Sequence, residues 1–435
     1  MLATLATGTL SVLVVVSAVF AQSGATYEGP PIEYGKHKTS DPVALLSRSI
    51  QAGKTTLEYD AKFGYLKALM SALKIPGETQ GLVFSKTSFQ NDVISPRNPR
   101  SVFFGDEVYL GFVPGGKVLE ITAMDRNQGP IFYSLDQGQV DRPRFVRRTS
   151  ECLVCHGSTR THEWPGNLVR SVYVDEKGHP RTNIGSFVTT HDSPFEQRWG
   201  GWYVTGTHGD LRHMGNTRLA EDEDAGKLDR DRGANVTDLK GRFATDRYLS
   251  SHSDIVALMV LEHQTHMHNL LSRANYVSRR AMYLQREANR ALGDPDDKMS
   301  EATGRVIDRS ANEILEYLMF KNEVFLTSPV QGTSAFTKTF PKRGRRDEKG
   351  RSLRDFDLKT RLFRYPCSYL IYSPSFDALP KQVLDRVYKR LGRILSGRTS
   401  RRAWKITKAQ RQVILEILLA TKPGVPAAWK QIRQR

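Results

Sequence analysis

The chain has 435 residues, of which 64 are Lys or Arg and 46 are Asp or Glu, so its formal net charge is +18. This length leaves room for two or three domains and for a hydrophobic core of useful size. The positive charge predicts attraction to an acidic partner, and nucleic acid is the first class to consider. The start of the chain argues against nucleic acid, because it predicts export from the cytoplasm.

The predicted export signal lies at the beginning of the chain. Residues 10–20 form an apolar run that is too short to span a bilayer comfortably. Ala21, followed by Gln22, fits the small-residue cleavage site of a secretory signal peptide. We therefore expect a signal peptide over residues 1–21 and a periplasmic or otherwise exported protein. The first eight residues contain no Lys or Arg, so an uncleaved membrane anchor stays open as an alternative.

The segment after the signal is predicted to be a linker followed by helices. Gly and Pro are frequent over residues 27–37, which is typical of a linker. Apolar residues then follow helical spacing over 43–50 and 65–73. We assign residues 22–97 to a linker and a helical N-terminal segment.

From Ser101 the pattern changes to short apolar runs that are separated by turn residues. Such runs are typical of β-strands. Pro-Gly-Gly at 114–116 predicts a hairpin turn between two of them. The expected strands cover residues 102–104, 108–113, 118–122, 131–134, 144–148, 168–173 and 185–190. We assign residues 98–250 to a β-rich region with an antiparallel sheet.

Within this region lies the pentapeptide 152–156, Cys-Leu-Val-Cys-His. Two cysteines separated by two residues and followed at once by histidine form the attachment signature of c-type haem. Each thiol adds to one vinyl group of the porphyrin, and the adjacent imidazole is carried under the iron as its proximal ligand. Over these residues and Gly157 the chain resembles the c-type cytochromes, although nothing else matches a small cytochrome c domain. The resemblance implies one covalent haem c, tethered by Cys152 and Cys155 with His156 on the iron.

Two other uses of the cysteine pair were weighed against haem. A structural zinc site needs two more ligands at tight spacing, and the one remaining cysteine, Cys367, lies far away in an apolar and aromatic run. A buried, inert thiol is expected there. A redox dithiol prefers a strand-to-helix turn inside a βαβ unit, whereas strand-like runs flank this motif. We therefore favour haem, which is attached to such motifs outside the cytoplasm and so agrees with the predicted signal.

The remainder of the chain is predicted to be helical. A long helix is expected over 253–291, with Ser251 or Ser253 as its cap and Gly293 after its end. Further helices are expected over 300–325, 381–395 and 408–421. We assign 251–330 to a long-helix region and 331–435 to a basic helical C-terminal region. The fold class is therefore α+β, with a β-rich central haem-bearing region flanked by helical N- and C-terminal segments.

The second axial ligand of the iron has several candidates. His263 lies at the centre of the apolar face of the long helix, between Met259 and Met267, whereas His268 is predicted to point away from that face. Iron ligation and an ordinary hydrogen-bonded core histidine are both open for His263. Methionine at helical spacing is usually core packing.

A second group of candidates follows the Trp-Gly-Gly-Trp segment at 199–202, which could form a wall against a flat ligand. His208, His213 and Met214 lie just after it. The alternatives are a glycine-rich turn with solvated histidines and an open distal position.

These features predict an exported monohaem protein whose main work is one-electron transfer. A haem sensor with a labile distal site is the first alternative. A peroxidase-like enzyme is the second, and His208 with Arg212 would have to supply its distal groups. Expected partners are a redox protein, for which the positive charge favours an acidic one, and an anionic membrane surface that faces the basic C-terminal region, but no nucleic acid.

Overall fold

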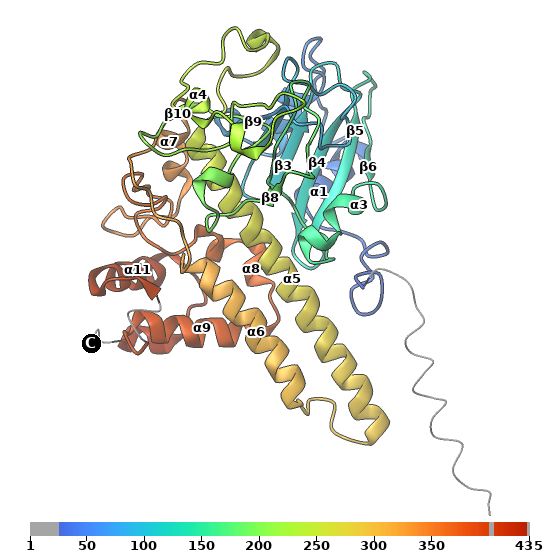
Figure 1. The fold of residues 1–435 in the computed structure, drawn as a ribbon. Helices are drawn as coiled ribbons and strands as arrows, with labels where there is room; N and C mark the ends of the chain where they lie inside the picture. The colour runs from blue at the N-terminus through green and yellow to red at the C-terminus, as the bar shows by residue number, and fades with distance from the viewer. Residues whose placement is uncertain (1–25, 400–403, 433–435) are drawn as a thin grey trace, which may run out of the picture.

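The centre of the molecule is a seven-stranded antiparallel sheet in the order β6-β5-β4-β3-β2-β1-β9 (Figure 1). The computed structural model describes residues 26–399 and 404–432, so the predicted signal peptide lies outside the described residues. Among the described helices, none is both long and apolar enough to cross a bilayer. With helices before and after the sheet, the fold is α+β, as the sequence predicts.

The strands fall close to the expected positions. The seven strands of the central sheet are β1 (Gly81–Val83), β2 (Arg100–Phe104), β3 (Val108–Phe112), β4 (Val118–Asp125), β5 (Gly129–Asp136), β6 (Phe145–Arg147) and β9 (Trp202–Tyr203). Two small pairs lie apart from it, β7 (Arg170–Val172) with β8 (Ser186–Val188), and β10 (Gly206–Thr207) with β11 (Gln331–Gly332). The expected hairpin turn joins β3 to β4, and Gly115 there has a φ of 79°, which favours glycine. The sequence did not predict β1, β9, β10 or β11.

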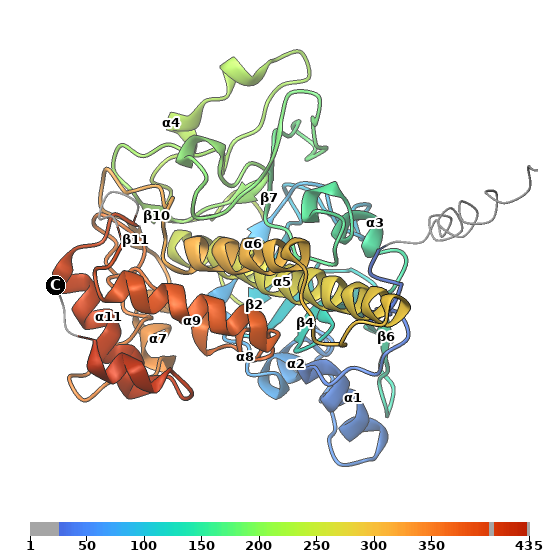
Figure 2. The same ribbon diagram turned by 90° about the horizontal axis from the view of Figure 1, so that it is seen from below.

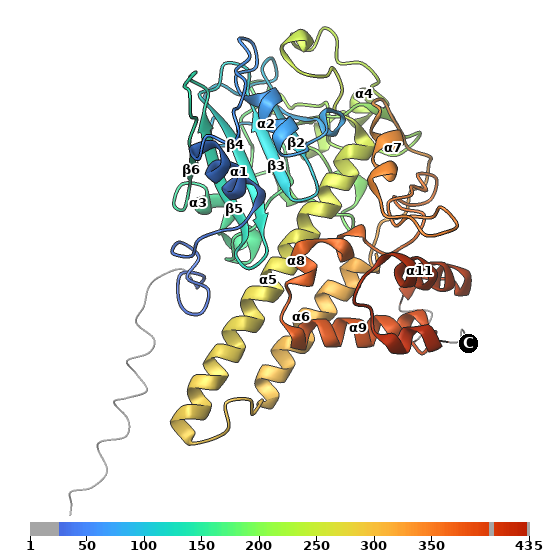
Figure 3. The same ribbon diagram turned by 180° about the vertical axis from the view of Figure 1, so that it is seen from behind.

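The two faces of the sheet differ in polarity because side chains alternate along each strand. One face carries apolar residues such as Leu110 and Ile121, which pack on α1 (Pro42–Gln51) and α2 (Leu66–Ala72). Figure 3 shows these two helices lying over the sheet. The register places Gly111 beside Glu120, and Glu120 beside Ser134, on the opposite face. That second face is therefore partly polar, and it is the one that bounds the site described below.

A long helix, α5 (Ile255–Leu292), runs past the second face and forms a hairpin with α6 (Glu301–Leu318) that extends beyond the sheet (Figures 1 and 2). Asp254 is its N-cap and accepts hydrogen bonds from the backbone N–H groups of residues 256 and 257. The expected serine cap is therefore wrong, because the Ser253 hydroxyl donates instead to the carbonyl of Tyr203. The C-terminus is as expected, with Gly293 in the left-handed conformation.

The remaining helices complete the C-terminal half of the molecule. α6 ends earlier than expected, shortly before Phe320, whose φ of 53° is incompatible with a continuing helix. α9 (Lys381–Leu395) and α11 (Lys408–Thr421) begin and end at the predicted residues. The short helices are α3 (Leu153–His156), α4 (Arg230–Gly233), α7 (Phe336–Thr339) and α8 (Pro374–Asp377).

One hydrophobic core runs through the segments that the sequence analysis treated separately. It includes Val83 of the sheet, Val256 of α5, Leu318 of α6 and Leu391 of α9. The central and C-terminal segments are therefore packed together rather than joined by free linkers.

Much of the basic C-terminal region is engaged in this packing. The Arg345 guanidinium lies over the Tyr372 ring at 5.3 Å and donates to the backbone of Thr421. Arg346 pairs with Asp355 at 3.0 Å. These arginines hold neighbouring segments of the C-terminal region together, which limits their freedom to bind a partner.

Candidate haem site

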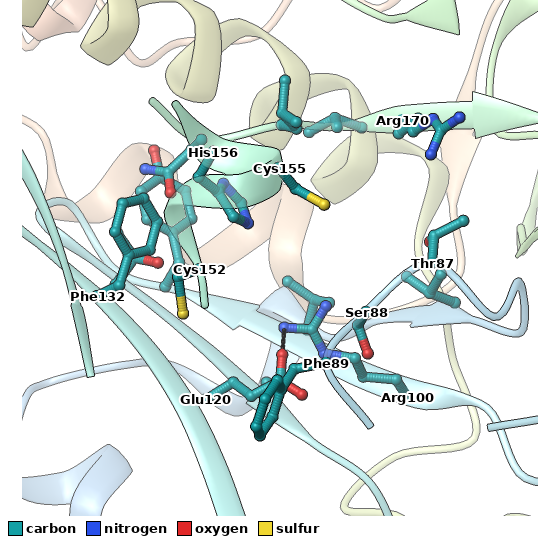
Figure 4. Close-up of a pocket in the computed structure, with 18 of the residues that line it drawn as sticks. Thr87, Ser88, Phe89, Arg100, Glu120, Phe132, Cys152, Cys155, His156 and Arg170 are labelled. Atoms are coloured by element: carbon teal, nitrogen blue, oxygen red, sulfur yellow. Dashed lines mark ion pairs between the residues drawn. The ribbon is translucent and has the colours of Figure 1, made fainter. Parts of the chain in front are cut away.

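The pentapeptide folds into α3, a single helical turn directly after β6 (Figure 4). The backbone N–H of His156 donates to the carbonyl of Cys152 at 2.9 Å. Because residues three and four apart share one side of a helix, this turn brings both cysteines and the histidine to the same side. Leu153 is buried in the core and anchors the turn, while Val154 is 76% exposed.

Gly157 ends the turn where there is no room for a side chain. A Cβ atom at this position would lie 2.9 Å from the Tyr27 hydroxyl oxygen and 3.1 Å from the carbonyl oxygen of Leu153. The glycine after the motif therefore lets the N-terminal segment pack closely against α3.

The ring of His156 is held in one orientation. Its Nδ1 lies 2.8 Å from the carbonyl oxygen of Gly166, and its ring packs on Phe132 with the centroids 4.7 Å apart. A carbonyl oxygen only accepts, so Nδ1 carries the proton and Nε2 keeps its lone pair. Figure 4 shows the imidazole directed into the cavity. Burial lowers the pKa of His156, and the hydrogen bond to Gly166 opposes this effect. The lowered pKa favours the neutral imidazole, which is the form that binds metals.

The cavity beside α3 has a volume of about 450 Å³. Cys152, Cys155 and His156 form one side of it, and the polar face of the sheet forms another. Leu261 of α5 and Trp202 of β9 also line it. This volume lies within the range of roughly 300 to 1,000 Å³ that is typical of ligand and cofactor pockets.

The two cysteines fit a role as tethers. Both are free thiols, Cys155 exposed and Cys152 half-buried. Burial, with smaller contributions from Glu120 and Glu151, raises the pKa of Cys152 to about 11. A redox dithiol reacts as a thiolate, so this raised pKa disfavours that alternative. In the part of the chain that the structure describes, no three His, Cys, Asp or Glu side chains are grouped to hold a metal ion.

The cavity residues fit a haem on these observations. The iron of a haem is already held by the porphyrin and needs only axial ligands from the protein. His156 presents a lone pair to the cavity, and its other nitrogen is fixed by a carbonyl, which is the usual support of a metal-bound histidine. Cys152 and Cys155 would hold the porphyrin, and His156 would bind the iron.

An ion pair faces His156 across the cavity. Arg100 of β2 and Glu120 of β4 lie 2.8 Å apart, with exposed fractions of 22% and 18% (Figure 4). The Arg100 charge lowers the pKa of His156 and the Glu120 charge raises it, both less than burial does, so these charges lie within electrostatic reach of the imidazole. The sequence alone does not identify either residue, because their contact depends on the register of three strands.

His263 does not line this cavity. Its side chain is fully buried, with Nδ1 2.8 Å from Nδ1 of His191 and Nε2 2.7 Å from the hydroxyl of Ser368. Both ring nitrogens thus have partners in the core, which matches the core-histidine alternative. His268 is also fully buried and bonds to the Tyr109 hydroxyl at 2.8 Å. His268 was predicted to point away from the apolar face that carries His263, and it is buried nonetheless, because the N-terminal half of α5 is packed on all sides.

The histidines that follow the Trp-Gly-Gly-Trp segment lie outside the cavity lining as well. His208 bonds to the carbonyl of Leu211 at 2.9 Å and accepts from the backbone N–H of Asn235 at 3.0 Å. His213 is buried, accepts from the backbone N–H of Gly215 and lies against the Trp199 ring.

Of the sulfur candidates, Met214, Met259 and Met267 are buried and do not line the cavity. Cys367 is fully buried in the C-terminal core, as the sequence predicts, and burial raises its pKa to about 12. Trp202 alone supports the predicted aromatic wall, because it lines the cavity and its indole N–H donates to the carbonyl of Arg170 at 2.8 Å.

The geometry therefore groups Cys152, Cys155 and His156 around one cavity and leaves the three candidate distal histidines elsewhere. Among the described residues that line the cavity, His156 is the only histidine, and no methionine is present. Comparison of the chain with protein-family models, with curated proteins and with solved structures found no match.

Proposed function

We propose that the chain carries one haem c, bound covalently through Cys152 and Cys155 with His156 as axial ligand, and that it transfers single electrons. The observation that carries the proposal is the free Nε2 of His156, directed into a cavity that both cysteines line. When bound, the haem supplies a one-electron iron couple, and the protein supplies attachment, orientation and charge.

The surface near Cys155 supports exchange of electrons with a partner. Cys155 is exposed and Val154 is largely exposed, so a cofactor tethered there has an edge close to the surface. Arg160 and Arg170 also line this part of the cavity, where burial and then the Arg160 charge lower the pKa of Arg170. The positive charge at this edge of the cavity favours an acidic protein as redox partner in the periplasm. Such a partner explains the charge without nucleic acid.

A second candidate function is the binding of a small molecule at the iron, for sensing or for peroxidase-like chemistry. The specific observation that favours it is the absence of a second histidine or a methionine among the described lining residues. An iron with only one protein ligand keeps a position for an external one. His208 and Arg212 do not line the cavity, so any distal polar group would be a different residue.

Haem retention after denaturation tests the covalent attachment. We expect the colour to stay with the polypeptide after acid extraction, because thioethers survive this treatment. Cys152→Ala together with Cys155→Ala should release all of it, whereas Cys367→Ala should release none. Colour that leaves the wild-type chain with the solvent contradicts the proposal.

The ferric visible spectrum distinguishes the two functions. A low-spin spectrum would indicate a second strong axial ligand and favour electron transfer. A high-spin spectrum that changes on addition of cyanide would favour ligand binding.

A further inference from the structure

The cavity carries an excess of positive charge. The charged groups among its described lining residues are Lys86, Arg100, Arg148, Arg160, Arg170, Glu120 and Glu151. Arg148 pairs with Glu151 at 3.3 Å, and Arg100 pairs with Glu120 at 2.8 Å. Three cations then have no carboxylate partner within the lining, so the cavity attracts anions.

Arg100 is the cation that the sheet itself positions. Its side chain starts on β2, crosses Gly111 of β3 and reaches Glu120 of β4. A Cβ atom on Gly111 would lie 2.4 Å from Nη2 of Arg100 and 2.6 Å from its Nε. Because Gly111 has no side chain, the guanidinium can lie directly against the backbone of β3 at this position.

Glu120 pairs with Arg100 but does not engage all the N–H groups of its guanidinium. One Glu120 oxygen pairs with Arg100, and the other accepts from the side-chain amide of Gln90 at 3.0 Å. The Nε–H of Arg100 is buried and has no hydrogen-bond partner. The Arg100 side chain as a whole is 22% exposed and lines the cavity, so its guanidinium is accessible to an anion there.

We propose that Arg100 binds small anionic ligands that enter the cavity on the side facing His156, and that Glu120 and Gly111 position its guanidinium for this task. The inference rests on the proposed haem and assigns a ligand class to the second candidate function. The ligands are monoanions of a few atoms, such as azide, nitrite or cyanide, since the bound porphyrin would occupy most of the cavity. Arg100 adds a charge-assisted hydrogen bond to the anion beyond its bond to iron.

The test is a spectrophotometric titration of the ferric holoprotein with azide, and with neutral imidazole as a second iron ligand. Arg100→Gln should weaken azide binding about tenfold or more and leave imidazole binding within about twofold, since a lost charge-assisted hydrogen bond is worth at least that factor. Arg148→Gln, which removes another paired cation of the lining, is the matched control and should change azide affinity by less than about threefold.

Glu120→Gln gives a prediction of opposite sign. Gln keeps an oxygen that can accept from Arg100 but removes the counter-charge, so azide binding should tighten. An ion pair with a purely structural role predicts instead that azide and imidazole affinities change together in both variants. Arg100→Lys keeps the charge, so it should retain part of the wild-type azide affinity, and this variant tests the proposal if Arg100→Gln does not fold.

Three outcomes overturn the inference. The first is a wild-type holoprotein that does not bind azide, and the second is an azide affinity that does not depend on Arg100. The third is a loss of haem content in Arg100→Gln with unchanged azide affinity, which would indicate that Arg100 anchors the haem carboxylates. Failure of the proposed function looks different, because it removes covalent haem from the wild-type chain itself.

Discussion

Two regions of this molecule contain buried histidines, and they differ in what the ring nitrogens contact. At α3, His156 bonds through one nitrogen to a backbone carbonyl and directs the other into a cavity. On α5, His263 bonds through one nitrogen to His191 and through the other to Ser368. An imidazole at the centre of an apolar helix face therefore does not identify a metal ligand. A fixed ring with one nitrogen free to face a cavity is the arrangement that a metal ligand needs.

The α5 region also shows how a core accommodates imidazoles through ring stacking and hydrogen bonds. His191, His263 and Tyr317 stack with their rings nearly parallel, and the His191 and Tyr317 centroids are 3.8 Å apart. Burial lowers the pKa of both histidines well below the ordinary value, so they are neutral at pH 7. The four predictions below use this contrast between the two regions.

The largest expected effect concerns the two histidines directly. His156→Ala should abolish the native axial field of the iron while the cysteines still hold the haem, because tethering and ligation are functions of different residues. His263→Ala should leave the visible spectrum unchanged. A His263→Ala spectrum that shifts from low-spin to high-spin would reverse the comparison.

The second prediction concerns stability. His263→Ala leaves a cavity in the core and removes a partner from His191 and Ser368, so the free energy of unfolding should fall by about 3 kcal/mol. Chemical denaturation of wild-type and variant proteins, followed by far-ultraviolet circular dichroism, measures the difference. His179→Ala, at an exposed position, should change it by less than about 0.5 kcal/mol.

The third prediction concerns acid. Burial lowers the pKa of His268 to about 3 from its ordinary value of about 6.5. Below pH 6.5 the unfolded chain takes up a proton that the folded chain does not, so stability is lost as the pH falls from about 6.5 towards 3, by at most about 1.4 kcal/mol per pH unit. His268→Gln can keep a bond to Tyr109 and removes this contribution. Its stability should therefore fall less steeply between pH 6.5 and 4.5 than that of the wild type, and equal slopes would contradict the assignment.

The smallest effect is expected for the cysteine far from the motif. Cys367→Ala removes one fully buried sulfur atom and should lower the free energy of unfolding by about 1 kcal/mol. Haem content and spectrum should not change. A loss of covalent haem would show that Cys367, rather than one cysteine of the motif, forms a tether.

Much of the fold could be read from local pattern. The predicted strands of the β3–β4 hairpin, the end of α5 at Gly293 and the bounds of α9 and α11 all agree with the structure. These features depend on apolar periodicity, turn residues and caps, which act over a few residues. β1 and β9 were missed because each is short and gains its hydrogen bonds from a partner distant in the chain.

The amino-acid sequence by itself determined that Cys152, Cys155 and His156 share one helical turn, because their spacing is a local property. It also determined that Cys367 would be buried. Only the tertiary structure decided what faces His156. Arg100, Gly111 and Glu120 meet through the pairing of three strands, and β5 brings Phe132 against the ring. The same packing encloses His263 and His268 on all sides of α5, since burial depends on every neighbouring element and not on one helix face.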